Sequence, residues 1–185
     1  MLASLVDIST LLVAIFTGGL LLAAVIAAAF TYVQLKSQAR NAKLVRVFAL
    51  SDRCADPTFM ALMTRAQTMF SMFSTDPAAG KKYWTDMKDD PGNFQSNILA
   101  VLNFLEEIAG EYRSGLLDRP AANGNVALVA VGAWTQAKGF ALWRREESRQ
   151  DEAWDELEAL AREWGKDPIP SWWRRPDTFF QSAHI

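Results

Sequence analysis

The stretch "NFLEEIAGEY", residues 103–112, places two adjacent glutamates, Glu106 and Glu107, inside an otherwise apolar helical run. Paired carboxylates can act as an acid/base couple, bind metal ions, or lie at the solvated edge of a packed helix. At about 100° per residue, Glu107 points about 160° away from the centre of the apolar arc, and Glu106 lies at its boundary. The two side chains therefore diverge by about 100° and cannot share one small site. We expect solvated or ion-paired glutamates, of which Glu106 is the better candidate for a functional role.

The helix around this stretch is predicted to run from about residue 94 to residue 114. Asn93 is a suitable N-cap residue, and Gly115 can supply a left-handed turn at the C-terminal end. The apolar side chains cover an arc of about 220°, which is wider than the stripe that a surface helix needs. This segment is therefore expected to be the central helix of an all-α bundle.

Capping signals divide the flanking sequence into further helices. Asp56–Pro57 and Asp76–Pro77 each combine an N-cap residue with a proline in the first turn. Asp151 is expected to cap a last helix that ends at Gly165. The sequence thus predicts a bundle of about five or six helices over residues 56–165.

The run "VALVAVGAW", residues 126–134, is open to two interpretations. Its β-branched residues make a strand possible, but no second strand is available to pair with it, and an isolated strand is not stable. We interpret it as a helix that is broken or loosened around Gly132, with a further helix beyond it.

Residues 11–33, "LLVAIFTGGLLLAAVIAAAFTYV", contain no charged side chain. At 1.5 Å per residue, such a helix spans the roughly 30 Å core of a bilayer. A signal peptide is the alternative, since "AAAF" imitates a cleavage site. It is disfavoured because residues 1–10 carry no Lys or Arg and the apolar run exceeds the usual ~7–15 residues. We therefore expect a short N-terminal stub, residues 1–10, and then a transmembrane helix.

Basic residues follow this segment directly, within a helical extension predicted over residues 34–55. The positive-inside rule places the stub outside and the rest of the chain in the cytoplasm. On a helix the four residues form a stripe about 120° wide, which could contact anionic lipid headgroups or could only determine topology. They are Lys36, Arg40, Lys43 and Arg46.

Small residues recur at intervals of four within the apolar segment. This pattern allows close approach of helices in lipid, although alanine is common in membrane helices and such matches also arise by chance. The candidate helix-packing residues are Ala14, Gly18, Gly19, Ala23 and Ala27.

The composition argues against several kinds of chemistry. Cys54 is the one cysteine and His184 the one histidine, which does not favour a disulfide, a zinc site or a catalytic triad. A net charge of −2 gives no indication of nucleic-acid binding. We expect no cofactor and no metal, and the sequence holds no constellation typical of an enzyme.

The C-terminal tail, residues 166–185, is too aromatic for ordinary disorder. It could pack on its own domain, dock on a partner through Trp and Arg anchors, or lie at the membrane interface. Its candidate contact residues are Trp172, Trp173, Arg174, Arg175, Phe179 and Phe180.

In layout, and in the stretches "LNFLEEIAGEYRSGLLD" and "LEALAREW", the chain resembles the bacterial proteins grouped as DUF4760-like, a domain of unknown function. The resemblance implies an anchored helical cytoplasmic domain at the bacterial inner membrane. It implies no activity, and it assigns no catalytic residues.

The sequence therefore predicts a non-enzymatic accessory or scaffold subunit that docks on another membrane protein or complex. The alternative is a membrane-tethered regulator that senses anionic lipid or a cytoplasmic effector. The expected partners are the lipid bilayer and either another membrane protein or further copies of the chain.

Overall fold

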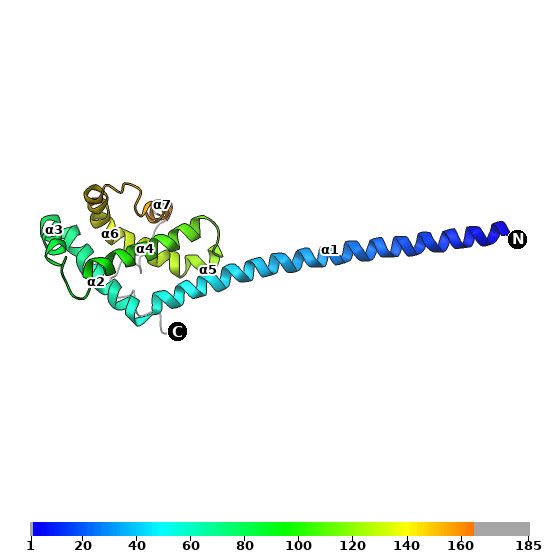
Figure 1. The fold of residues 1–185 in the computed structure, drawn as a ribbon, viewed down its shortest axis with the longest axis horizontal. Helices are drawn as coiled ribbons and strands as arrows, with labels where there is room; N and C mark the ends of the chain where they lie inside the picture. Colours follow the sequence, from blue (N-terminus) through cyan, green and yellow to red (C-terminus); the bar gives the residue numbers. More distant parts are fainter. Residues whose placement is uncertain (1, 165–185) are drawn as a thin grey trace. The chain divides into compact units, whose positions relative to one another are not determined.

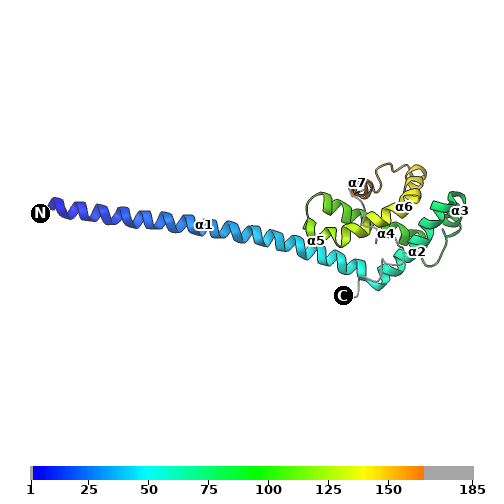
Figure 2. The same cartoon turned by 180° about the vertical axis from the view of Figure 1, so that it is seen from behind.

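The structure, a computed structural model, describes residues 2–164, and within them the side chains of residues 10, 12–13 and 15–164. The described residues form helices and connecting turns without a strand, so the predicted all-α fold is confirmed. The helices are α1 (Leu2–Ala55), α2 (Pro57–Thr75), α3 (Pro77–Asp86), α4 (Phe94–Arg113), α5 (Arg119–Asn123), α6 (Val126–Ser148) and α7 (Asp155–Trp164). Figures 1 and 2 show them from opposite sides.

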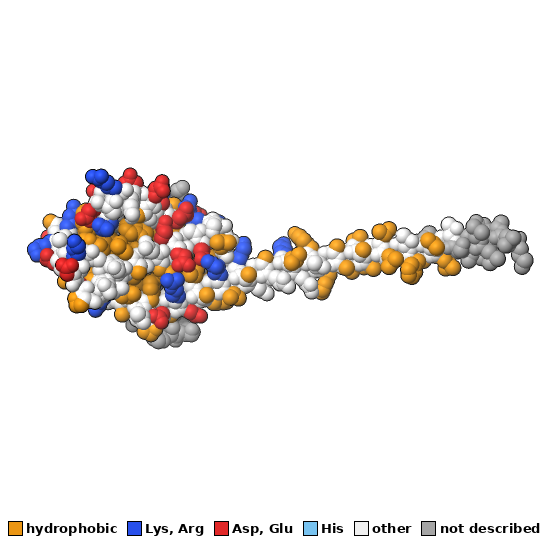
Figure 3. Space-filling model, in the orientation of Figure 1, with side chains coloured by type: hydrophobic (Ala, Val, Ile, Leu, Met, Phe, Trp, Pro, Cys, Tyr) orange, Lys and Arg blue, Asp and Glu red, His pale blue; other side chains and the backbone are white. Residues whose placement is uncertain are grey.

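The chain divides into two compact units, residues 1–42 and residues 43–185. The first unit is the N-terminal part of α1, where large apolar side chains such as Phe16, Leu20 and Phe30 are exposed (Figure 3). Thr31 donates its hydroxyl to the carbonyl of Ala27, so this polar group is satisfied inside its own helix. In the described part of the chain, one helix near the N-terminus is long and apolar enough to cross a membrane; a signal sequence shares these features.

The second unit is a helical bundle whose first helices begin as the sequence predicts. The Asp56 side chain accepts the backbone N–H groups of Thr58 and Phe59 at the start of α2. Asp76 does the same for the first turn of α3. The N–H of Phe59 is the main cause of a lowered pKa at Asp56.

Helix α4 lies inside the bundle, where α2, α6 and α7 pack against it, and it shares this central place with α6, against which α2, α4, α5 and α7 pack (Figure 1). Its wide apolar arc buries side chains along its whole length, including Phe94, Ile98, Leu105 and Tyr112. A second group of rings closes the core between α2, α3 and α6, with edge-to-face and tilted contacts. It comprises Phe70, Phe73, Trp84, Phe140 and Trp143.

Two local predictions were wrong, and a third was confirmed only in part. Asn93 occupies the N-cap position before Phe94, as predicted, but its side chain makes no cap bond: its φ is 52°, and its backbone N–H donates to the carbonyl oxygen of Asp90. Helix α6 is unbroken at Gly132, since the buried neighbours Val131 and Ala133 offset the roughly 1 kcal/mol that a mid-helix glycine costs. Residues 151–154 form a turn, so Asp151 caps nothing and α7 begins at Asp155.

Candidate functional site

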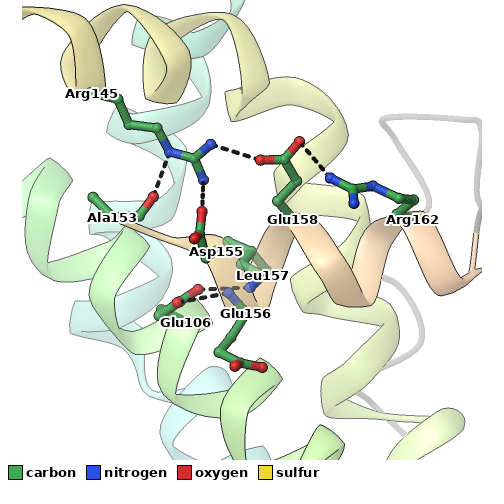
Figure 4. A network of polar contacts seen from close by, with 8 residues as sticks. All are labelled: Glu106, Arg145, Ala153, Asp155, Glu156, Leu157, Glu158 and Arg162. Atoms are coloured by element: carbon green, nitrogen blue, oxygen red, sulfur yellow. Dashed lines mark hydrogen bonds and ion pairs between the residues drawn. The ribbon is translucent and has the colours of Figure 1, made fainter. Parts of the chain in front are cut away.

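Glu106 supplies the cap that α7 lacks in its own sequence. Its two carboxylate oxygens accept the backbone N–H groups of Glu156 (3.0 Å) and Leu157 (2.7 Å), the second and third residues of α7 (Figure 4). These are the donors that an N-cap side chain normally satisfies. The residue before α7 is Trp154, which cannot cap because its side chain has no acceptor. A side chain of α4 therefore fixes the start of a helix 50 residues further on.

Asn103 lies one turn before Glu106 on α4 and also contacts the residue that precedes α7. Its Oδ1 accepts the indole N–H of Trp154 at 3.0 Å, while Trp154 adopts a left-handed backbone conformation with φ 62°. A left-handed conformation is unfavourable for a bulky residue, so it persists only where the surroundings enforce it. Here the indole hydrogen bond and the burial of the ring enforce it.

The pKa of Glu106 is raised, and burial is the main cause. The two backbone hydrogen bonds act in the opposite direction, and the nearby carboxylates of Glu156 and Asp155 add to the increase. The carboxylate is half-buried, so the sequence expectation of a solvated or ion-paired group at this position was wrong.

Arg145 of α6 organises the other side of the turn. Its Nε donates to the carbonyl of Ala153 (2.6 Å) and its Nη1 to Glu158 (2.7 Å), and Asp155 lies 3.1 Å from Nη2 (Figure 4). The hydrogen bond from Arg145 is the main cause of a lowered pKa at Glu158. The polar groups around the start of α7 are thus engaged with one another.

A pocket of about 190 Å³ lies beside Glu106. Arg144 contributes a buried Nε without a hydrogen-bond partner among the described residues, but the two Glu106 oxygens are already used by α7. The volume is below the ~300–1,000 Å³ typical of small-molecule sites. The lining residues are Leu99, Asn103, Glu106, Arg144, Ser148, Gln150, Ala153 and Trp154.

Glu106 and Glu107 do not form a pair of carboxylates in one site, as predicted. Glu107 is exposed and lies 3.4 Å from Arg53, whose guanidinium covers the Phe104 ring. Within the described residues, no group of three or more His, Cys, Asp or Glu side chains is placed to hold a metal ion. The contacts of Glu106 instead hold the start of α7 against α4.

The four predicted lipid-contacting residues, Lys36, Arg40, Lys43 and Arg46, are all exposed. Arg46 also donates hydrogen bonds from Nε and Nη2 to the carboxylate of Glu111 on α4. Sequence reasoning missed Glu111, the one buried charged residue among those described. No local signal marks it, because its partner lies 65 residues earlier.

The predicted helix-packing residues all lie in α1. Gly18, Gly19, Ala23 and Ala27 are exposed, and a Cβ on either glycine would meet no described atom within 4 Å beyond its chain neighbours and the backbone of its own helix. The side chain of Ala14 and the six predicted tail residues, Trp172 to Phe180, lie outside the described part of the chain.

A model of the DUF4760 family, described as a domain of unknown function, matches residues 19–164. No curated protein and no solved structure matches the chain.

Proposed function

The chain belongs to the DUF4760 family, and we propose that it is a non-enzymatic accessory subunit, anchored in a bacterial inner membrane by α1, whose helical bundle docks on another membrane protein. The exposed apolar surface of α1 carries this proposal. Side chains such as Phe16, Leu21 and Val25 are 59–71% exposed, as are the other large apolar residues of that stretch. Water disfavours such a surface by about 25 cal/mol per Å², whereas lipid accepts it.

The polar side chains of the bundle connect its helices to one another, and this supports a docking role. Glu106, Arg145 and Glu111 hold helices together, and the aromatic rings of α2, α3 and α6 fill the core. The pocket beside Glu106 is small. These features suit a rigid module that presents a surface.

The basic residues after the apolar segment support an orientation with the bundle in the cytoplasm. Lys36, Arg40 and Lys43 follow the segment on the same helix, and a surplus of Lys and Arg marks the cytoplasmic side of a membrane helix. Arg46 adds to this surplus although it also contacts Glu111.

One observation favours a second candidate function, a regulator that senses anionic lipid. Lys36, Arg40 and Lys43 are exposed, and each such charge near an anionic membrane contributes about 1 kcal/mol.

The test is purification of the full chain from native membranes in mild detergent, followed by mass determination. A heterologous membrane protein present in a fixed ratio supports the accessory role. Recovery of the chain in the soluble fraction, or without any heterologous protein, overturns it.

Liposomes containing phosphatidylglycerol test the regulator. Salt-sensitive binding that the triple variant Lys36→Gln/Arg40→Gln/Lys43→Gln abolishes would favour it over the accessory role. Arg46→Gln is the single-charge control: it removes one positive charge from the same stripe, at the residue that contacts Glu111, and should leave most of the salt-sensitive binding in place.

A further inference from the structure

One row of positions on α1 combines large apolar, small and amide side chains and carries no charge. Within residues 1–42, the positions on this face alternate at spacings of four and three, the repeat of a two-stranded coil. All eight lie in the helix with exposed side chains. This heptad face consists of Phe16, Leu20, Ala23, Ala27, Phe30, Gln34, Ser37 and Asn41.

We infer that the heptad face binds a second copy of the chain, forming a parallel dimer through α1. The inference is independent of the proposed function, since an accessory subunit and a lipid sensor could both have a dimeric anchor. Its occupant is identified by three properties of the face: its charge, its small residues and its amides.

The absence of charged residues from the heptad face allows two copies of it to contact each other. The eight positions include no Asp, Glu, Lys or Arg. On a helical wheel at about 100° per residue, Lys36 and Arg40 point roughly 150° and 110° away from the centre of the face. Two copies can therefore approach without opposing like charges, while both basic side chains remain on the outer side of the pair.

Small and large side chains alternate suitably for close packing in lipid. Ala23 and Ala27 are one turn apart and allow the two backbones to approach, which is how membrane helices associate without a hydrophobic driving force. Phe16, Leu20 and Phe30 flank them and are 71%, 59% and 64% exposed. Pairing these three side chains from each copy buries on the order of 600 Å², about half of the lower limit for a stable interface.

The amides select a second copy over an unrelated helix. Gln34 and Asn41 are seven residues apart and so occupy equivalent heptad positions, just beyond the apolar segment. Each amide carries a donor and an acceptor, so in a parallel pair each meets its twin and both are satisfied. Asparagine at such a position is known to fix a parallel, in-register dimer. Two copies inserted in the same sense are parallel already.

Disulfide crosslinking of the full chain in its membrane tests the dimer. In a Cys54→Ser background, we expect Gln34→Cys and Asn41→Cys to form a product of twice the chain mass on mild oxidation. Ala39→Cys is the matched control: it is exposed on the same helix but points about 150° away, and it should crosslink at least tenfold less. No product of doubled mass, or equal crosslinking at all three positions, overturns the inference.

A second measurement does not depend on cysteine chemistry. In mild detergent, Ala27→Leu should shift the chain from dimer to monomer because the larger side chain separates the backbones. Ala29→Leu places the same change about 130° from the face and should leave the dimer intact. A dimer without any heterologous protein would sink the accessory role and still support this inference; a monomer bound to a heterologous protein would do the reverse.

Discussion

Arg46 in α1 and Glu111 in α4 form a two-pronged ion pair, with Nε and Nη2 of the guanidinium donating to the two carboxylate oxygens. The two partners differ in exposure: the Arg46 side chain is 53% exposed, and the Glu111 side chain is 9% exposed. The arginine can be hydrated if the pair is broken, whereas the glutamate cannot. The pair therefore holds the C-terminal part of α1 against α4. It also compensates the negative charge of the buried Glu111 carboxylate.

We predict that Arg46→Met destabilises the bundle more than Glu111→Gln does. The first change strands a buried carboxylate, and an unsatisfied buried group costs more than a lost exposed one. The free energies of unfolding in urea, measured on the full chain in mild detergent, give the order. The double variant should lose less than the sum of the single variants, and additive losses would show that the pair is not coupled.

Replacing Glu106 should loosen the start of α7. Glu106→Ala removes both acceptors for Glu156 and Leu157, and loss of an N-cap typically costs about 1 kcal/mol. The unfolding midpoint in urea measures the change. Glu107→Ala, the adjacent exposed glutamate, is the control and should change stability by less than about 0.5 kcal/mol. Equal losses would contradict the assignment of the cap to Glu106.

The same residue predicts a pH dependence with a definite sign. Because burial raises the pKa of Glu106 above its ordinary value of 4.5, the folded protein binds more protons at this site than the unfolded chain does. Its contribution to stability therefore falls as the pH rises from about 4.5 to the raised pKa, and stays constant above it. Unfolding of the wild type and of Glu106→Gln across this range gives the difference between them. Relative to the variant, the wild type should lose stability with rising pH, and a difference that is flat or of opposite slope would refute the prediction.

The bundle's main features could be predicted because their causes are local. The apolar arc of α4 follows from side-chain spacing within one helix. Asp56 and Asp76 each accept backbone N–H groups that lie two and three residues further along the chain. Asp151 is also an N-cap residue type, although no proline follows it, and it caps nothing in the described structure. The start of α7 depends on Glu106 and Asn103, which the bundle brings near from some 50 positions earlier. A rule that considers only neighbours in sequence cannot identify such a cap.

The basic stripe shows the same limit of prediction from neighbouring residues. Spacing alone places Arg46 with Lys36, Arg40 and Lys43, since all four share one side of a helix. The packing of α4 against the end of α1 brings Glu111 to Arg46. Periodicity therefore identified the helix and its charged side, but not which of its charges are used inside the bundle.

Cys54 should react slowly while the protein is folded. Burial raises the pKa of its thiol to about 11, although the nearby charge of Arg53 opposes the increase. The thiolate is the reactive form, so at pH 7.5 alkylation by iodoacetamide should be much slower than for a free thiol with a pKa of about 8.5. Mass spectrometry of timed samples measures the rate, and adding urea should restore normal reactivity. Rapid labelling of the folded chain would show that the thiol is accessible and ionised.

Two glycines should respond to alanine with opposite signs. A Cβ on Gly80 in α3 would lie 2.7 Å from Cδ2 of Phe73, whose ring is held between Phe140 and Trp143 and has no room to move. Gly80→Ala should therefore destabilise the bundle by about 1–3 kcal/mol, despite the better helix propensity of alanine. In α6, the nearest atom to a Cβ on Gly139 is the carbonyl oxygen of Phe73 at an ordinary 3.8 Å. Gly139→Ala should stabilise by about 0.5–1 kcal/mol, because only the helix propensity changes. Urea midpoints of the two variants test the pair, and a stabilised Gly80→Ala would mean that the Phe73 ring is not fixed by its neighbours.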